Sequence, residues 1–411
     1  MSIQTLTLYG ATGFTGTLAA RALWDELRKP EYQPIARLCL AGRNAGKLHA
    51  LRESLGPDAV QAITIHVADS SDAESLDSLT RQSDLVLSAA GPFSLHSPRL
   101  IQACVRNACH YLDITGETPF IRSMIDQHHL GAQTARVKII PFCGFDSIPS
   151  DLGFRAIHAE WAQRYPDTPC EKVTALFSVR GGFNGGTLAT ALLMARSGES
   201  KRVESDLQLL SPSHSTTDQP PAAPDWKDER FFPVVKTWGA PFFMAPINTR
   251  VVRRSQLLSS ELSLPVPSAS YSTCLYEEGM RVKSRFQGRI VWKTQSVFAR
   301  VTQSRIGLSL LETLVPAPGS GPSEKAQKNG LTHVHYLAEG KDGRSLQGRL
   351  HWDGDPGNSF TIFAFTQAAF CLLKGEISES HQREFGVLTP SVAFGDALWK
   401  RLQNNGMSWS I

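Results

Sequence analysis

The chain has 411 residues, 41% of them hydrophobic and 19% charged, and its 42 basic and 38 acidic side chains leave a net charge of +4. At about 100 to 200 residues per domain, this length predicts two or three domains with enough apolar material for a core. A chain this apolar and this nearly neutral is not disordered. Its weak positive charge also excludes strong electrostatic binding to nucleic acid.

Seven cysteines are an odd number, and none belongs to a CxxC pair, so neither a disulfide framework nor a zinc site is expected. The longest apolar run, Phe360–Leu373, has about 14 residues with threonine and glutamine among them, too short and too polar for a membrane span. A strand pattern begins at Ile3, before any targeting segment would fit. We therefore expect a cytoplasmic protein with no integral membrane span.

The first 145 residues alternate short β-branched runs with helical stretches. Strands are predicted at Gln4–Tyr9, Ala36–Ala41, Ile63–Val67, Leu85–Ala89, Tyr111–Ile114 and Val137–Phe142. Helices are predicted at Gly16–Leu27, Ala45–Leu55 and Ala73–Thr80, and from Ser97-Pro98 onward. This alternation is typical of an α/β fold, a doubly wound parallel sheet of the Rossmann kind.

After about residue 150 the strands alternate apolar and polar residues, which indicates a second α+β domain with a mixed or antiparallel sheet. Its clearest elements are a strand at Val173–Val179 and a hairpin formed by His333–Ala338 and Ser345–Trp352. Two Pro/Ser/Gly-rich segments, Ser211–Pro224 and Pro316–Gly330, are predicted surface loops, and the first is long enough to be a lid.

A helical pattern begins at Pro390, runs through Leu402 and is closed by Gly406. We place the boundaries at residues 1–150 for the first domain, 151–385 for the second and 386–411 for a C-terminal helix that packs back on the first.

A glycine-rich loop leaves the first predicted strand and opens the first predicted helix. Its three glycines have distinct tasks: Gly10 permits a tight turn, Gly13 lets the backbone approach a pyrophosphate, and Gly16 allows close helix packing. The residues between them, Thr12, Phe14 and Thr15, complete the expected contact with a dinucleotide. The strand–loop–helix context favours dinucleotide binding over a purely structural turn.

The end of the second strand predicts which dinucleotide binds. NAD-selective folds place an acid there, about 20 residues past the loop, to hold the ribose hydroxyl. This chain instead has Arg43 and Asn44, followed by Lys47. A guanidinium can fork onto a phosphate, so NADP(H) is favoured over a solvated helix-start arginine. Asp69, after the third strand, is a candidate for the adenine amino group and equally a helix cap.

The fourth strand ends in small residues, which would let a cofactor cross the sheet where its strand order reverses. Ala89, Ala90 and Gly91 are assigned to that crossing, with Pro92 and Phe93 bordering the nicotinamide. Tight packing alone is the alternative.

Two polar clusters follow later strands, and both should face the cofactor cleft. Reduction of an unsaturated bond needs a proton as well as a hydride, and the donor candidates are Tyr111 and Asp146. The remaining cleft residues are Asp113, Glu117, Gly144, Phe145 and Ser147. The alternative is structural: the acids bond loop backbone, and Asp146 or Ser147 caps the helix that Pro149 begins.

At these motifs the chain resembles the saccharopine dehydrogenase-like oxidoreductases, including the trans-acting enoyl reductases. The matching stretches are GATGFTG, AGRN with KL, SAAGPF, YLDITGE, CGFDSIPSDLG, GGFNGGT at 181–187, APINTRVVRRS at 245–255, GDPGN at 354–358 and the ending from Gly386. They cover nearly the whole chain in order. Asn358 departs from the aromatic residue that many relatives carry there, and the Ser211–Pro224 loop is individual to this chain.

The resemblance implies an NADP-dependent reductase acting on a carbon–carbon double bond of a polyketide-derived lipid precursor. The expected partner is a small apolar acyl substrate, free or bound to coenzyme A or a carrier protein, and a homodimer is left open. Imine reduction, as in saccharopine formation, and a non-catalytic NADP-binding, lipid-associated scaffold are the alternatives.

Outside these motifs, Arg250, Arg253 and Arg254 lie in a strand-like stretch, where they either form ion pairs on a sheet face or dock the phosphate of a coenzyme A or carrier arm. His333 and His335 share one face of a strand, but the spacing indicates no third ligand. No metal site is expected.

Overall fold

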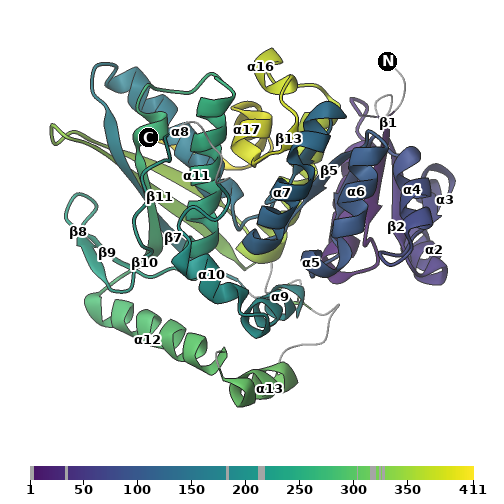
Figure 1. Ribbon diagram of the computed structural model, residues 1–411, viewed down its shortest axis with the longest axis horizontal. Helices are drawn as coiled ribbons and strands as arrows, with labels where there is room; N and C mark the ends of the chain where they lie inside the picture. Colours follow the sequence, from purple (N-terminus) through teal and green to yellow (C-terminus); the bar gives the residue numbers. More distant parts are fainter. Residues whose placement is uncertain are drawn as a thin grey trace.

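The computed structural model describes residues 4–32, 36–181, 185–211, 218–302, 304–314, 321–323, 325 and 329–411. Two seven-stranded sheets, joined by helices, make up the molecule, and Figure 1 shows them side by side, with the first sheet on the right. The loop 181–187 and the segments Ser211–Pro224 and Pro316–Gly330 fall partly outside the described residues. The predicted lid, Ser211–Pro224, is therefore not described as a whole.

The first sheet is parallel throughout, with strand order β13-β6-β5-β4-β1-β2-β3. Its strands are β1 (Gln4–Tyr9), β2 (Ala36–Gly42), β3 (Thr64–Val67), β4 (Leu85–Ser88), β5 (His110–Asp113), β6 (Lys138–Ile140) and β13 (Gly386–Val387). Because chain order reverses between β1 and β4, the carboxyl ends of these two strands form the switch point of a Rossmann fold. The predicted fold class is confirmed.

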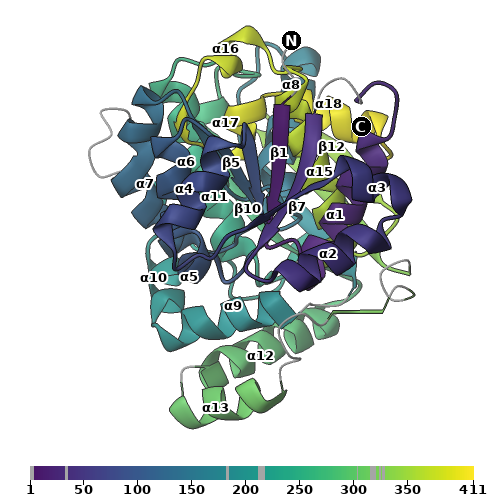
Figure 2. The same ribbon diagram turned by 90° about the vertical axis from the view of Figure 1, so that its right-hand side faces the viewer.

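Helices cover both faces of this sheet, and Figure 2 shows α1 and α2 on one side of the strands and α4, α6 and α7 on the other. Their bounds are α1 (Phe14–Leu27), α2 (Ala45–Ser54), α3 (Pro57–Ala62), α4 (Ala73–Arg81), α5 (Phe93–His96), α6 (Pro98–Arg106) and α7 (Thr118–Thr134). Leucines of α4 and α6 pack with strand residues in one apolar cluster, while α1 and α2 pack in the other. Sequence patterning missed α3, α5 and α7.

The second sheet is mixed, with strand order β14-β12-β11-β7-β10-β9-β8. Its strands are β7 (Cys170–Arg180), β8 (Arg230–Phe232), β9 (Thr237–Ala240), β10 (Leu275–Val282), β11 (Leu331–Gly340), β12 (Ser345–Trp352) and β14 (Ser408–Ser410). The predicted hairpin is present as the antiparallel pair β11–β12, whereas β7 and β10 run parallel. The α+β architecture expected for this region is therefore confirmed.

The remaining helices pack around the second sheet and between the two sheets. They are α8 (Ile148–Arg164), α9 (Gly185–Arg196), α10 (Glu199–Ser205), α11 (Ala245–Glu261), the 3-10 turn η1 (Tyr271–Thr273), α12 (Arg285–Thr302), α13 (Arg305–Leu314), the π turn η2 (Pro356–Phe360), α15 (Thr361–Leu373), α16 (Glu379–Gln382), α17 (Pro390–Phe394) and α18 (Ala397–Asn404). Among the described helices, none is long and apolar enough to cross a membrane.

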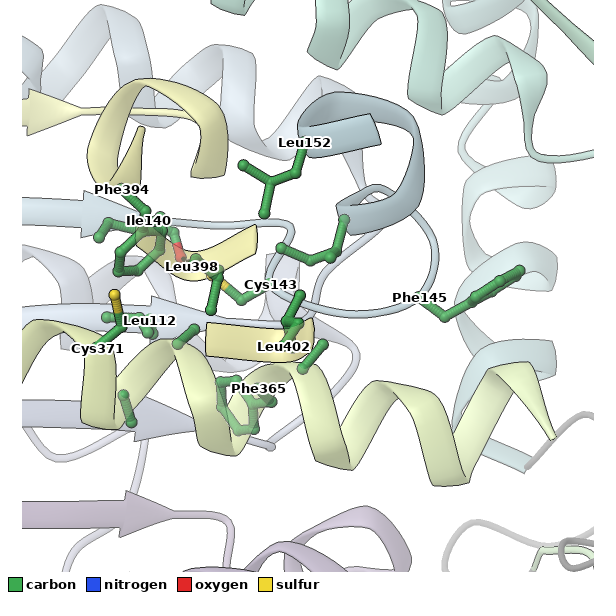
Figure 3. Close-up of a cluster of buried hydrophobic side chains, with 14 of the residues drawn as sticks. Leu112, Ile140, Cys143, Phe145, Leu152, Phe365, Cys371, Phe394, Leu398 and Leu402 are labelled. Atoms are coloured by element: carbon green, nitrogen blue, oxygen red, sulfur yellow. Dashed lines mark hydrogen bonds between the residues drawn. The ribbon is translucent and has the colours of Figure 1, made fainter. Parts of the chain in front are cut away.

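One continuous apolar core joins the two sheets. The run predicted as a buried helix is α15; its Cys371 points toward Leu112 of the first sheet (Figure 3), and Phe365 belongs to the same buried cluster as Leu112 and Ile140. Phe145 belongs to the same core but points away from that group, and its ring lies edge-on to Phe177 in the second sheet. The sheets are thereby fixed to each other by buried apolar surface.

The C-terminal region contacts both sheets. β13 extends the first sheet beside β6, while β14 pairs with β12 in the second. The single helix predicted from Pro390 to Leu402 is wrong in one respect, because Gly395 at φ +55° divides it into α17 and α18. The domain boundaries at 150 and 385 remain predictions.

Candidate functional site

The glycine loop between β1 and α1 is shaped by close backbone contacts. Gly10 adopts φ +76°, and a Cβ built on it would lie 2.8 Å from both the Cβ and the backbone nitrogen of Ala90. A Cβ on Gly16 would lie only 2.1 Å from the carbonyl oxygen of Gly10. Both positions therefore require glycine, one to join the ends of β1 and β4 and one to seat α1 on the loop.

Gly13 differs from the other two glycines because it faces open space. A Cβ there would meet only the Gly10 carbonyl oxygen, at 3.4 Å. Gly13 is the N-cap of α1, and no side chain caps the helix, so the first-turn N–H groups of Phe14, Thr15 and Gly16 have no side-chain acceptor. Uncapped N–H groups at a helix start suit a pyrophosphate. Thr12 lies in the same loop, half-buried.

Two cations stand at the end of β2. Arg43 and Lys47 are exposed, and Arg43 forms no salt bridge within the described ranges. The Asn44 side chain caps α2 by accepting a hydrogen bond from the Lys47 N–H at 2.9 Å. This edge of the sheet therefore offers a free guanidinium rather than the acid that holds an unphosphorylated ribose.

Asp69 is partly engaged by its own turn. Its Oδ1 accepts hydrogen bonds from the backbone N–H and the hydroxyl of Ser71, at 2.8 and 2.7 Å. These bonds lower the pKa of Asp69, and the Arg43 cation lowers it further. The adenine contact remains a prediction.

The loop after β4 is held in place by a buried carboxylate. Glu117 accepts hydrogen bonds from the backbone N–H of Phe93 at 2.6 Å and of Ser94 at 3.0 Å. Ala89 and Ala90 remain half-buried, Gly91 is exposed and Pro92 is half-buried beside the buried Phe93. Glu117 thus fixes the loop that is predicted to border the nicotinamide. Binding of loop backbone is the structural role expected from the sequence as the alternative for Glu117.

Tyr111 and Asp113 form a closed pair beneath this edge. The Tyr111 hydroxyl lies 3.0 Å from Ser97 Oγ and donates to Asp113 Oδ2 at 2.9 Å, and both side chains are fully buried. Asp113 Oδ1 also accepts from the Thr115 N–H. Burial raises the pKa of Tyr111 well above its usual value and that of Asp113 to about 7. Neither group presents a surface to a substrate.

Asp146 has a different setting. It is half-buried, and no hydrogen bond to its carboxyl group occurs within the described part of the chain. Its Oδ2 faces Gly116 after β5, since a Cβ built on Gly116 would lie 3.6 Å from Oδ2 and 3.4 Å from the Ile247 side chain. Burial raises the pKa of Asp146 to about 6. A carboxyl group so placed can hold a proton near neutral pH.

The residues on either side of Asp146 are occupied structurally. The Phe145 N–H donates to Thr361 Oγ1 at 3.1 Å, and a Cβ on Gly144 would lie 3.2 Å from the Thr361 methyl group. The Ser147 hydroxyl donates to Asn248 Oδ1 at 3.2 Å. These contacts tie the loop after β6 to α15 and α11, so Asp146 is presented from a fixed backbone.

Behind this loop lies a buried polar network that sequence reasoning missed. Glu278 on β10 accepts hydrogen bonds from Asn248, Ser150 and Tyr276, at 2.8, 2.7 and 2.9 Å. Burial raises the pKa of Glu278 to about 7. Tyr276 lies two residues away on the same strand, whereas Asn248 and Ser150 come from α11 and α8, and no sequence spacing brings these two to Glu278.

The predicted strand placement of the basic cluster is wrong, although the ion pairing expected as one alternative is present at Arg250. Arg250, Arg253 and Arg254 lie on helix α11, not on a strand, and each is at most 2% exposed. Arg250 pairs with Asp225 at 2.5 Å, and Arg253 donates to the carbonyl oxygens of Leu207 and Ala223. The Arg250 and Arg253 guanidinium groups thus hold residues 203–207 and 223–225, and burial of all three arginines leaves none exposed to dock a substrate phosphate.

Comparisons with known proteins agree with this geometry. Residues 6–140 match the saccharopine dehydrogenase NADP binding domain. A putative trans-acting enoyl reductase of Mycobacterium tuberculosis is 33% identical over 98% of this chain and 96% of its own length. A trans-acting enoyl reductase of Mycobacterium ulcerans is 30% identical over the same shares. Apo saccharopine dehydrogenase (L-Glu forming) from Saccharomyces cerevisiae shares the fold, with a TM-score of 0.53 and 11% identity over 99% of both chains.

The glycine loop, the free Arg43 and these matches define an NADP-dependent oxidoreductase. The chain belongs to the saccharopine dehydrogenase-like family, in the group that contains the trans-acting enoyl reductases. The family resemblance and the cofactor predicted from the sequence are both confirmed. The roles of individual site residues remain predictions.

Proposed function

We propose that the protein reduces the carbon–carbon double bond of an α,β-unsaturated acyl substrate of polyketide type. The observation that carries this proposal is Asp146, a half-buried carboxyl group without a hydrogen-bond partner in the described chain, beside the carboxyl edge of the NADP-binding sheet. The names of the mycobacterial relatives support the same reaction class.

When bound, NADPH supplies a hydride to the β-carbon of such a substrate. The pyrophosphate is expected at Gly13 and the uncapped start of α1, with the 2′-phosphate at Arg43. Ala89 to Phe93 border the nicotinamide, and Glu117 holds that loop still.

Asp146 then protonates the α-carbon, and the double bond becomes a single bond. Its raised pKa keeps a useful fraction of the acid form near neutral pH. Tyr111, the other donor predicted from sequence, is fully buried and already donates its proton to Asp113. The geometry therefore supports Asp146 over Tyr111.

The positions of the basic side chains near the second sheet are compatible with an apolar substrate. A diacid substrate such as saccharopine would call for arginines converging on the cleft. The three clustered arginines of α11 are instead buried against backbone carbonyls or Asp225. Ile247, at the start of α11, meets Gly116 and so lies on the same side as Asp146. This apolar neighbour suits an acyl chain.

The location and partner are part of the same proposal. All seven cysteines are free and buried, which suits a reducing compartment such as the cytosol. The acyl chain is proposed to arrive as a thioester, on coenzyme A or a carrier protein.

The test is NADPH consumption with two substrate classes. An enoyl thioester should be reduced, while an amine together with an oxo acid should not. Turnover of the second pair alone would overturn the proposal in favour of imine reduction. Tight NADPH binding with no turnover of either class would favour the scaffold alternative.

A further inference from the structure

Three side chains of types that can bind metal lie together beside the second sheet, on elements other than those assigned to NADPH. His158 comes from α8, Cys170 begins β7 and Cys274 directly precedes β10. Each is at most 1% exposed. The two cysteines are 104 positions apart, which is why no spacing rule finds them.

The three ligand atoms are already at coordination spacing. The two thiol sulfurs are 3.8 Å apart, and both lie within 4.8 Å of a nitrogen of the His158 ring. Two sulfurs each bound at about 2.3 Å to one metal ion are separated by roughly 3.8 to 4.0 Å at tetrahedral or trigonal angles. The sulfur pair therefore needs little movement to take up an ion.

His158 is oriented by its surroundings. Its Nδ1 lies 3.0 Å from Ser268 Oγ, and its ring packs edge-on against Phe154 and Tyr271. Ser270, which is bonded to Ser268, accepts the N–H of Cys170 at 3.0 Å. The same serine pair thus fixes both a histidine and a cysteine, as partners behind metal ligands commonly do.

The second nitrogen of this histidine, Nε2, is buried and makes no short hydrogen bond in the described chain, although the ring interacts with the Cys170 thiol, whose pKa is lowered by Cys274 and also by His158. A buried polar atom without a partner costs free energy. A metal ion beside the two sulfurs would supply the missing interaction.

We propose that His158, Cys170 and Cys274 form a binding site for a thiophilic d10 metal ion. Two soft sulfurs and an imidazole select Cu(I) or Zn(II) among cellular metals. Structural zinc almost always takes four protein ligands, whereas the described chain offers three here. The donor set therefore favours three-coordinate Cu(I).

Binding needs no redox step. Each thiol would lose its proton to solvent as its sulfur binds, and His158 would bind through the ring nitrogen that does not face Ser268. The ion would then connect α8 to two neighbouring strands of the second sheet. We expect it to stabilise the fold rather than to take part in hydride transfer.

The test uses the full chain, reduced and kept free of oxygen. Samples are loaded with Cu(I) or with Zn²⁺, passed over a competing chelator, and assayed for retained metal by mass spectrometry and X-ray absorption. We expect about one Cu(I) per chain with two sulfur ligands and one nitrogen ligand, and a higher unfolding temperature. Cys170→Ser and Cys274→Ser should each reduce retention at least about tenfold.

A matched control comes from the other buried pair of thiols. Cys104 and Cys109 interact with each other, but the metal-binding cluster does not include them. Cys109→Ser should retain one equivalent of Cu(I). If the serine variants do not fold, His158→Gln tests the same ion through its nitrogen ligand.

Three results would overturn the proposal. They are no metal retained by the folded chain, equal retention in the cysteine variants and the control, and a Cys170–Cys274 disulfide that persists under the reducing conditions of the assay. Retention of Zn²⁺ but not Cu(I) would overturn the choice of copper. Because NADPH binding should be the same in every variant, a failure here is separate from a failure of the proposed function.

Discussion

Asp146 and Asp151 lie five residues apart in one motif, yet they belong to two regions with opposite properties. At the carboxyl edge of the first sheet, Gly13 faces open space, and within the described chain Arg43 has no ion-pair partner. Asp146, called the open acid below, has no hydrogen-bond partner for its carboxyl group among the described residues. Between α8, α11 and α17, Asp151 accepts hydrogen bonds from the Ser255 hydroxyl and the Ser391 N–H. Polar groups left open indicate ligand binding, and polar groups fully paired indicate support.

The largest effect is expected at the open acid. Asp146→Asn removes the proposed proton donor and should lower kcat by about 10³-fold, while NADPH affinity and thermal stability stay unchanged. Steady-state kinetics with an enoyl thioester measure the loss of kcat, and a thermal melt checks that stability is unchanged. Asp146→Glu, which keeps an acid, should recover part of the rate, and unchanged turnover in Asp146→Asn would exclude this residue as the donor.

The paired acid should behave in the opposite way. Asp151→Ala leaves the buried Ser391 N–H without its acceptor and should cost about 3 kcal/mol in the free energy of unfolding. The fraction that remains folded should keep its kcat. Urea unfolding and active-site titration measure these quantities, and a stable but inactive variant would contradict the distinction.

The glycine loop offers a comparison within the open region. Gly16→Ala would place a Cβ 2.1 Å from the Gly10 carbonyl oxygen and should destabilise the fold by about 2 to 3 kcal/mol. Gly13→Ala meets the same oxygen at 3.4 Å, so the protein should fold but bind NADPH more weakly. Equal stability losses in the two variants would argue against Gly13 as the phosphate contact.

The two ends of β2 provide the next comparison. Arg43→Ala should weaken NADPH binding by roughly 10- to 100-fold and leave NADH binding unchanged, because only NADPH carries the 2′-phosphate. Arg37, exposed near the start of the same strand, is the control, and Arg37→Ala should change neither affinity. Fluorescence titration with both nucleotides measures these affinities. An equal loss of NADH affinity would mean that Arg43 contacts a part of the cofactor other than the 2′-phosphate.

The smallest effect concerns pH. Burial raises the pKa of Asp146 to about 6, and the acid form is the one that donates a proton. We therefore expect kcat/KM to be level below pH 6 and to fall about tenfold for each pH unit above it. A profile that rises with pH through 6 would mean that the essential form is the carboxylate.

The sequence predicts the cofactor-binding edge of the first sheet better than it predicts the buried region around Asp151. The first sheet follows from local signals, since each strand end carries its own glycines, small residues or charges, and the strand–loop–helix pattern at Gly10 to Gly16 has few other meanings. Arg43 is similarly readable because its position follows directly from β2.

The support region is set by contacts that the sequence does not encode locally. Ser147 meets Asn248 across 101 positions, and Glu278 gathers donors from α8 and α11. The arginines of α11 are interleaved with valines in a stretch that resembles a strand, but all three are buried on a helix. Nothing in the motif itself distinguishes Asp146, which has no hydrogen-bond partner in the described chain, from Asp151, which is hydrogen-bonded. Only the folded structure shows the difference.

The most direct test of the proposed reaction is transfer of a label. NADPH deuterated at the reactive position of the nicotinamide should be incubated with an enoyl thioester, and the product analysed by mass spectrometry and NMR. We predict one deuterium on the β-carbon and, in deuterated water with unlabelled NADPH, one on the α-carbon. A product without cofactor-derived deuterium, or labelling only of an imine carbon when an amine and an oxo acid are supplied, would contradict enoyl reduction.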